Sequence, residues 1–540
     1  MGLPSAGPIR RAVAARRSFR IPAVFAWSLA TLPVLAQHAP VPLQRDFNAD
    51  IERAGALRES RMHTGLKPLI GSRAELDDVL GYRQDSTRHY YWLTEKLLRD
   101  HLLEVKGDGF RLIADPLFEF QWGIDEGDPS DYPTNRRYRV NTRGVRVKGD
   151  LGGKISFESM FHETQTVLPG YLHRMVQEEG VLMGHGRVKF DGGVVDVGWS
   201  RSCVSYVPVR WLNLQVGHGR HFVGHGHRSM LLSDQAPDAP YVKASFLLLQ
   251  DRVQYTTWHT KLTHRLRTPD DRLAAGDASE AIFYWSRARF NHLSARMGRV
   301  ELGLFDATIF RNIDENGLVA FDALELNPLV GVAGLVAGFD GPYKTLVGAD
   351  LKVRLHDQAI VYGQWASDRP GERMAWQAGL RVFDLPVQGM NAQVEYNTAD
   401  AFMYMSDPVR QAYVHAATPL AHPMGAHFEE VTAMLEHTYR RFRGQARVNL
   451  AHYNKDRGFL ENHGGDLLKP DVPASAPEGP WAQRLTFLDL NGSYLFNPKT
   501  NMRLVAGFMR RDLQGAPDIR QSGYLYIALR TGLYDRYYDL

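Results

Sequence analysis

Histidine and glycine are concentrated in one short stretch, Gly217–Ser229, which reads GHGRHFVGHGHRS. Imidazole nitrogens bind transition metals and glycine-rich turns cradle phosphate, so both kinds of site have to be considered. A phosphate loop needs a helix directly after the turn, and no helical period follows Arg228. A metal site lacks support as well, because no carboxylate or thiol stands at ligand spacing and no zinc signature matches. We therefore predict neither a metal nor a cofactor here.

The glycines of this stretch suit a bulge or a sharp bend at the end of a strand that covers Trp211–Val216. If the chain forms a barrel, this bend would lie at its rim. Arginine and histidine donors beside an aromatic face could also hold an acidic sugar polymer. The residues predicted for such glycan binding are Trp211, His218, Arg220, His225, His227, Arg228, Asp234 and Tyr241.

No catalytic arrangement is predicted elsewhere in the chain. The carboxylates Asp306, Glu429 and Glu430 have no partner at a predictable distance, as a glycoside-cleaving pair would need. No Ser–His motif of a lipase stands in a recognisable context. We predict that the protein is not an enzyme.

Residues 1–36 have the pattern of a secretory signal peptide. Five arginines and no acidic residue accompany an apolar run, Ile21–Ala30, and small residues lead to Ala36. The rest of the chain has 59 basic and 60 acidic residues, a balance that gives no reason to expect nucleic acid as a partner. The single cysteine, Cys203, excludes an internal disulfide.

A helical N-terminal segment is predicted over residues 37–105. Ser72-Arg-Ala-Glu75 fits a capping box at the start of a first helix. A second helix is predicted over Tyr90–Leu103, and we expect its apolar stripe to pack against the rest of the protein. That stripe consists of Leu93, Leu97, Leu98 and Leu102.

After Lys106 the hydrophobic period changes to two, which indicates strands with one wet and one dry face. Ala446, Val448 and Leu450, for example, alternate with Gln445, Arg447 and Asn449. The wet face carries charged residues in strand after strand, and the dry face mixes aliphatic with aromatic residues, as in outer-membrane barrels. We predict an all-β fold: a closed antiparallel transmembrane outer-membrane barrel over residues 106–540, with about 18 strands by the usual length of strand plus connection.

The predicted connections fall into two classes. Asn497–Thr500 and Gly149–Gly153 are tight, whereas 311–327, 400–428 and 454–482 are long and rich in Pro, Gly, Asn, Asp or His. Short turns at one end and long loops at the other are typical of such barrels.

Several motifs, in this order, resemble the Wzi-like capsule-assembly family of outer-membrane barrels, and within it most closely the RemB-like gliding motility branch of Bacteroidota. They are HTGLKP (His63–Pro68), WLNLQVGHGRHFVGHGHRSMLLSD (Trp211–Asp234), GLFDATIF (Gly303–Phe310), ELNPLV (Glu325–Val330), GADLKVRLHDQAIVYGQWASD (Gly348–Asp368), EYNTADAFMYMSD (Glu395–Asp407) and PLAHPMGAHFEE (Pro419–Glu430). The resemblance extends from about residue 60 to the C-terminus.

The resemblance implies an 18-stranded barrel of the outer membrane that engages surface or capsular polysaccharide, in capsule attachment or in adhesion during gliding. The implied partners are outer-membrane lipid and the barrel-insertion machinery, and we expect a monomer. A terminal aromatic residue is the implied insertion signal. Here Tyr538 and Leu540 keep the terminal alternation and are predicted to serve as that signal.

Two other functions stay open at this point. The first is a diffusion pore for small polar solutes, which needs an open lumen. The second is a soluble exported β-protein such as a propeller, which should show a repeat of about 40–50 residues.

Overall fold

The computed structural model describes residues 38–40, 43–45, 51–53, 62–72, 91–127, 137–267, 283–314, 317–339, 341–458, 460–474, 478–515, 521–532 and 537–539. All of them belong to one compact unit, residues 36–540. The predicted signal peptide, the predicted first helix after Ser72, and Leu540 lie outside the described residues.

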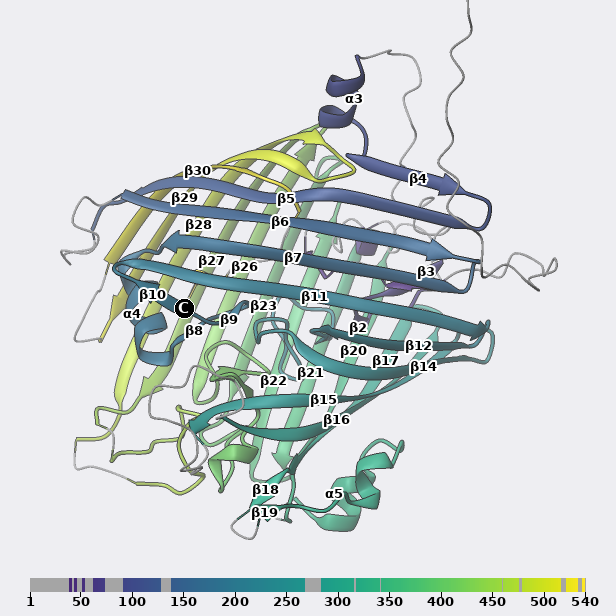
Figure 1. Cartoon of the computed structure of the whole chain (residues 1–540). Coiled ribbons are helices and arrows are strands. Elements are labelled where there is room, and N and C mark those ends of the chain that lie inside the picture. Colours follow the sequence, from purple (N-terminus) through teal and green to yellow (C-terminus); the bar gives the residue numbers. More distant parts are fainter. Residues whose placement is uncertain are drawn as a thin grey trace, which may run out of the picture. The chain divides into compact units, whose positions relative to one another are not determined.

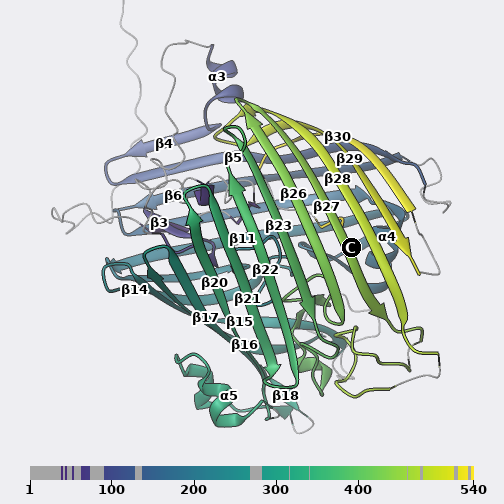
Figure 2. The same cartoon turned by 180° about the vertical axis from the view of Figure 1, so that it is seen from behind.

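Eighteen antiparallel strands form a closed ring, which confirms the predicted fold class and strand number (Figures 1 and 2). The ring closes where the last strand pairs with the first, with Leu529 opposite Phe120. In order the strands are β5 (Phe110–Asp125), β6 (Arg137–Leu151), β7 (Ile155–Val167), β11 (Val194–Val209), β12 (Leu212–Gly219), β14 (Ala239–Leu248), β15 (Val253–Arg267), β16 (Phe283–Met297), β17 (Val300–Arg311), β20 (Lys344–His356), β21 (Ala359–Arg369), β22 (Arg373–Phe383), β23 (Met390–Ala399), β26 (Phe428–Tyr439), β27 (Phe442–Lys455), β28 (Trp481–Asn497), β29 (Met502–Gln514) and β30 (Gln521–Arg530).

The two faces of the ring differ as the alternation predicts. On β27, Arg447 and Asn449 point into the lumen and are buried, whereas Leu450 points outward and is exposed. Exposed apolar side chains surround the outer wall, among them Trp122, Phe161, Val216, Val242, Leu304, Val394 and Leu525. In hydrocarbon the outer face of a barrel must be apolar because it contacts lipid, while the lumen can stay polar. The closed ring also pairs the backbone groups of every strand.

The two ends of the ring also differ as predicted. The short end has turns such as 152–154, 210–211 and 498–501. The long end has connections such as 312–343, 400–427 and 456–480. In barrels of this type the long loops lie outside the cell and the short turns in the periplasm.

The N-terminal helix before the barrel is shorter than predicted. α3 covers Trp92–Leu98 only, and its side chains, including Leu93, are not buried. The expected apolar packing is therefore wrong. After the helix, the Leu102 amide donates a hydrogen bond to Asp115, and His101 lies 2.7 Å from the same carboxylate. These contacts hold the chain where β4 (Leu103–Gly107) begins to pair with β5.

Polar contacts hold α3 at the short end. The Asn497 side chain donates to the carbonyls of Lys96 and Asp100, and Lys499 lies 2.7 Å from the Asp100 carboxylate. None of the helices in the described part of the chain has the length and apolar character needed to cross a membrane.

The largest apolar cluster lies inside the ring. Met230, Leu231 and Leu232, between β12 and β14, pack with wall residues such as Trp258 and Phe290. Tyr404 and Tyr413 of the long connection 400–427 join the same cluster. A segment between two strands therefore enters the lumen and packs against its wall.

Candidate functional site

The connection between β12 and β14, residues 220–238, folds into the lumen, and we call it the plug. It contains β13 (Phe222–Val223), which pairs with β2 (Leu66–Lys67) of the N-terminal segment. All but one of its residues, the partly buried Gly226, are buried. The predicted bend at the barrel rim is thus corrected: the glycine-rich stretch turns inward and crosses the interior.

The glycines allow this path because other groups approach the plug backbone closely. Gly224 has φ +122°, and a Cβ there would lie 1.9 Å from the Gln364 side chain. A Cβ on Gly226 would lie 2.5 Å from the Glu395 carboxylate and 2.6 Å from Gln377. Only glycine fits both positions without displacing the wall.

Arg228 is the centre of a buried ion network. Its guanidinium lies 2.6 Å from Asp539 and 3.2 Å from Glu430. The amides of His227 and Arg228 both donate to the Glu395 carboxylate. Burial alone would lower the pKa of Arg228, but Asp539 and Glu430 raise it above its ordinary value. A charge this deep in a protein needs such partners.

A second buried network anchors both ends of the plug. Asp238 lies 2.9 Å from Arg201 and 3.0 Å from Arg220, and these arginines outweigh burial and lower the pKa of Asp238 to about 2. The Arg220 guanidinium also donates to the Asp234 carbonyl, and the Asp234 carboxylate lies 3.3 Å from Arg45. The plug is therefore tied to the wall and to the N-terminal segment by charged groups.

The plug histidines each have separate neighbours. His221 lies against Tyr241 and 3.2 Å from Lys243, and His225 lies 3.2 Å from Asp350. Burial lowers the pKa of His221 and of His227 well below the ordinary value. The positive charge of Lys243 adds to the effect on His221, and that of Arg45 adds to the effect on His227, so both rings are neutral at pH 7. Within the described ranges, no group of three or more His, Cys, Asp or Glu is placed to hold a metal.

The N-terminal segment fills the lumen beside the plug. Lys67 donates to the Gly224 carbonyl and lies 3.0 Å from Glu52. The amides of Thr64 and Gly65 donate to the Glu301 carboxylate on β17. The HTGLKP motif thus packs inside the barrel rather than simply preceding it.

The structure does not bring the eight predicted glycan-binding residues together. Arg220, His225, His227, Arg228 and Asp234 are buried in the plug, and Tyr241 lies on the inner wall against His221. Trp211 lies in the turn before β12, at the short end. His218 lies near the other end of β12, and its ring is 2.9 Å from the Ser200 carbonyl. The prediction assumed that the stretch stays at the rim, whereas its inward path buries five of these residues and leaves Trp211 and His218 at opposite ends of the barrel.

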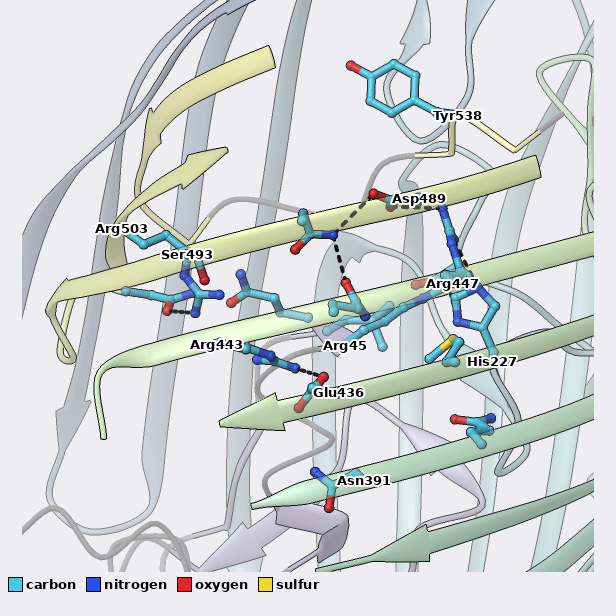
Figure 3. Close-up of a pocket in the computed structure, with 18 of the residues that line it drawn as sticks. Arg45, His227, Asn391, Glu436, Arg443, Arg447, Asp489, Ser493, Arg503 and Tyr538 are labelled. Carbon is cyan, nitrogen blue, oxygen red and sulfur yellow. Dashed lines mark hydrogen bonds and ion pairs between the residues drawn. The ribbon is translucent and has the colours of Figure 1, made fainter. Parts of the chain in front are cut away.

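The C-terminal residues also depart from the prediction. The last strand ends at Arg530, so Tyr538 does not continue its alternation. The described tail lies in the lumen instead, where Tyr537 donates to Asp234 and Asp539 is fully buried beside Arg228. Tyr538 lines an interior cavity, and its hydroxyl faces away from Arg447 in Figure 3.

That cavity, of about 210 Å³, lies in the lumen next to the plug. Two ion pairs line the cavity: Arg443 pairs with Glu436, and Arg447 lies 3.5 Å from Asp489 (Figure 3). Its lining also includes Arg45, His227, Asn391, Gln393, Gln445, Asn491, Ser493 and Arg503. Such fixed donors and acceptors suit a small, hydroxylated or charged solute better than an apolar one.

Sequence reasoning missed the cavity although a signal for it was present. Arg443, Gln445 and Arg447 on β27, and Asp489, Asn491 and Ser493 on β28, stand two residues apart. Each set therefore shares one face of its strand. The alternation identified the wet face, but which strands meet around a cavity depends on how the ring closes.

Comparison with solved structures supports the fold alone. Wzi, an outer membrane protein involved in group 1 capsule assembly in Escherichia coli and described as a carbohydrate-binding β-barrel, is similar to this chain with a TM-score of 0.52 and 11% identity, over 92% of this chain and all of that one. Pseudomonas aeruginosa OpdQ (TM-score 0.41, 10% identity) and Acinetobacter baumannii OccAB2 (TM-score 0.42, 11% identity) each cover 78% of this chain and 97% of their own. No protein-family model matches the sequence, and no curated protein matches it.

Proposed function

We propose that the protein is a non-enzymatic barrel of the outer membrane that engages surface polysaccharide at its long-loop end, in capsule attachment or in gliding-associated adhesion. The observation that carries this proposal is the plug, because a lumen crossed by a segment held in buried ion pairs suits a binding platform better than an open pore. The fold likeness to Wzi, named as a carbohydrate-binding barrel, agrees with it. The export signal and the RemB-like branch remain parts of this proposal.

The plug also holds the long loops in place. The hydroxyls of Tyr404 and Tyr413 donate to the carbonyls of Met230 and Leu231, and the Ser233 amide donates to the Leu420 carbonyl. Loops ordered in advance lose little conformational entropy when they bind. A rigid surface with many weak contacts then gains affinity for a repeating polymer through multivalency.

One place at the long end has the chemistry for such a contact. The guanidinium of Arg457 lies 5.4 Å from the ring centre of Trp481 and 3.2 Å from Glu478, and it is exposed. A flat aromatic face beside a guanidinium can stack on a sugar ring and bind its acidic groups.

Binding of purified barrel to polysaccharide from the same cell surface tests this role. We expect affinity to rise with polymer length, and the Arg457→Ala and Trp481→Ala variants to weaken it. Lys106→Ala, an exposed cation before the first barrel strand, is the matched control and should bind normally. Equal binding by all three variants would remove this contact from the proposal, and absence of any polysaccharide binding by the unaltered barrel would refute it.

A gated path for small polar solutes is the second candidate, and the polar cavity beside the plug favours it. Such a path requires the plug to move. Ion conductance of the unaltered barrel in planar bilayers would support this function, whereas conductance only after deletion of residues 222–233 would favour the platform.

A further inference from the structure

A polar seam runs along the outside of the wall on β15, β16 and β17. Antiparallel pairing aligns Thr257, Asn291 and Asp306 across the three strands, and likewise His259, Arg289 and Thr308. The alternate residues Trp258, Phe290 and Ala307 pack in the interior cluster. Because successive side chains point to opposite faces, the six aligned residues point outward.

The central part of this seam is nevertheless buried. Arg289, Asn291, Asp306 and Thr308 are each at most 1% exposed, and the Arg289 guanidinium lies 3.1 Å from Asp306 and 3.2 Å from Thr308. Outward-pointing residues of the same strands, such as Leu302 and Leu304, are exposed. Something outside the ring must therefore cover the polar residues.

The cover is residues 319–339 of the connection between β17 and β20, which we call the flap. Arg289 donates to the Leu324 carbonyl, Arg287 lies 2.7 Å from Glu325, and the Tyr255 hydroxyl donates to the Pro328 carbonyl. The flap thus contacts outward-pointing side chains of β15 and β16. Figure 1 shows its helix α5 (Val332–Ala337) outside the ring, beyond β16.

The flap is ordered by its own capping box. Asp322 accepts from the Leu324 amide and Glu325 accepts from the Asp322 amide, around the short helix η2 (Ala323–Leu326). Its Glu325 side chain and its Leu324 and Pro328 carbonyls face the seam, whereas several of its apolar side chains are left exposed. Leu335 is 84% exposed and Val336 67%, and Phe321, Leu326 and Leu329 are also exposed.

We propose that the flap lies within the membrane and that its apolar face contacts lipid acyl chains. An Arg–Asp pair facing hydrocarbon without cover would be costly, and the flap removes that cost while presenting apolar surface in its place. The apolar face continues the outer wall on either side, where Val242 on β14 and Leu351 on β20 are exposed. The proposal rests on the membrane location in the proposed function, but not on polysaccharide binding, so the two can fail separately.

Spin labels in proteoliposomes test this placement. Cys203→Ser removes the native cysteine, and single cysteines are then introduced by Leu335→Cys, by Leu351→Cys as the lipid-facing reference, and by Arg210→Cys as the aqueous reference in a short turn. We expect the ratio of oxygen to nickel-chelate accessibility at 335 to match that at 351 and to exceed that at 210 several-fold.

Two results would overturn the proposal. One is a label at 335 that is as accessible to the nickel chelate as the label at 210, which would place the flap in water. The other is a short label-to-label distance at 335 between molecules at low protein density, which would assign this face to a second copy of the chain. Gel mobility before and after heating shows whether the Leu335→Cys variant folds. If it does not fold, Val336→Cys can be compared with positions 351 and 210 in its place.

Discussion

The plug and the flap each bury an arginine–carboxylate pair, but on opposite sides of the barrel wall. Arg228 with Glu430 and Asp539 lies inside the ring, and Arg289 with Asp306 lies outside it. Both arginines are almost fully buried. The plug is surrounded by protein, so its apolar residues join a core, whereas the flap has protein on one side only and leaves Leu335 and Val336 exposed. Buried charge must be paired on both sides, but the segment that buries it is apolar-packed inside the ring and leaves apolar side chains exposed outside it.

The largest effect is expected from Arg228→Leu. Glu430 and Asp539 would be left buried without their main cation, which typically costs about 3–5 kcal/mol of stability. Denaturant unfolding of the barrel in detergent, with hydrogen exchange of the plug amides, measures the loss. Arg457→Leu, at an exposed site, should change stability little. A similar small change in both variants would show that the inner network does not hold the plug.

A double variant tests whether the outer pair, Arg289 and Asp306, needs both of its charges. Arg289→Leu leaves Asp306 without its guanidinium at a covered site and should destabilise the barrel by about 3 kcal/mol, the low end for a broken buried pair, because only one carboxylate loses its partner. Arg289→Leu combined with Asp306→Leu removes both charges and should recover most of that loss in lipid vesicles. A double variant as unstable as the single one would contradict a membrane-covered seam.

A smaller loss is expected from Gly226→Ala. The added Cβ would lie within 2.5 Å of the Glu395 carboxylate and 2.8 Å of the Arg228 carbonyl, and overpacking of this kind costs about 1–3 kcal/mol. Gly492→Ala on β28 is the matched control, since nothing lies within 4 Å of a Cβ there. Equal unfolding midpoints for the two variants would mean that the plug backbone shifts freely.

A loosening of the plug in acid is also expected. Burial lowers the pKa of His63 and of His415 to about 4, from an ordinary value of 6.5. As the pH falls, the two histidines of the unfolded chain take up protons near pH 6.5, whereas those of the folded chain do so only near pH 4. The free energy of unfolding is therefore full above pH 6.5 and decreases as the pH drops towards 4. Hydrogen exchange of plug amides at pH 7 and pH 4.5 should show the change. His415→Asn should reduce the pH dependence, and an unaltered profile would remove His415 from the cause.

The alternation of side chains determined most of the wall. A period of two places every second residue on one face, so the strands, the closed antiparallel barrel and its two unlike ends could be predicted from residues such as Ala446–Leu450. Strand number followed from length alone. The GHGRHFVGHGHRS stretch could be recognised as a departure from the strand pattern.

The path of the connections depends on contacts between distant parts of the chain, which local sequence does not show. Whether residues 220–238 stay at the rim or enter the lumen depends on partners such as Gln364, Glu395 and Asp539, which lie more than 130 residues away in the sequence. The outward Asp306 could be seen to interrupt an apolar face, but its cover by Leu324 and Glu325 could not. Period two is a local property of the backbone, whereas the pairing of buried charges is set by contacts that form only when the ring closes.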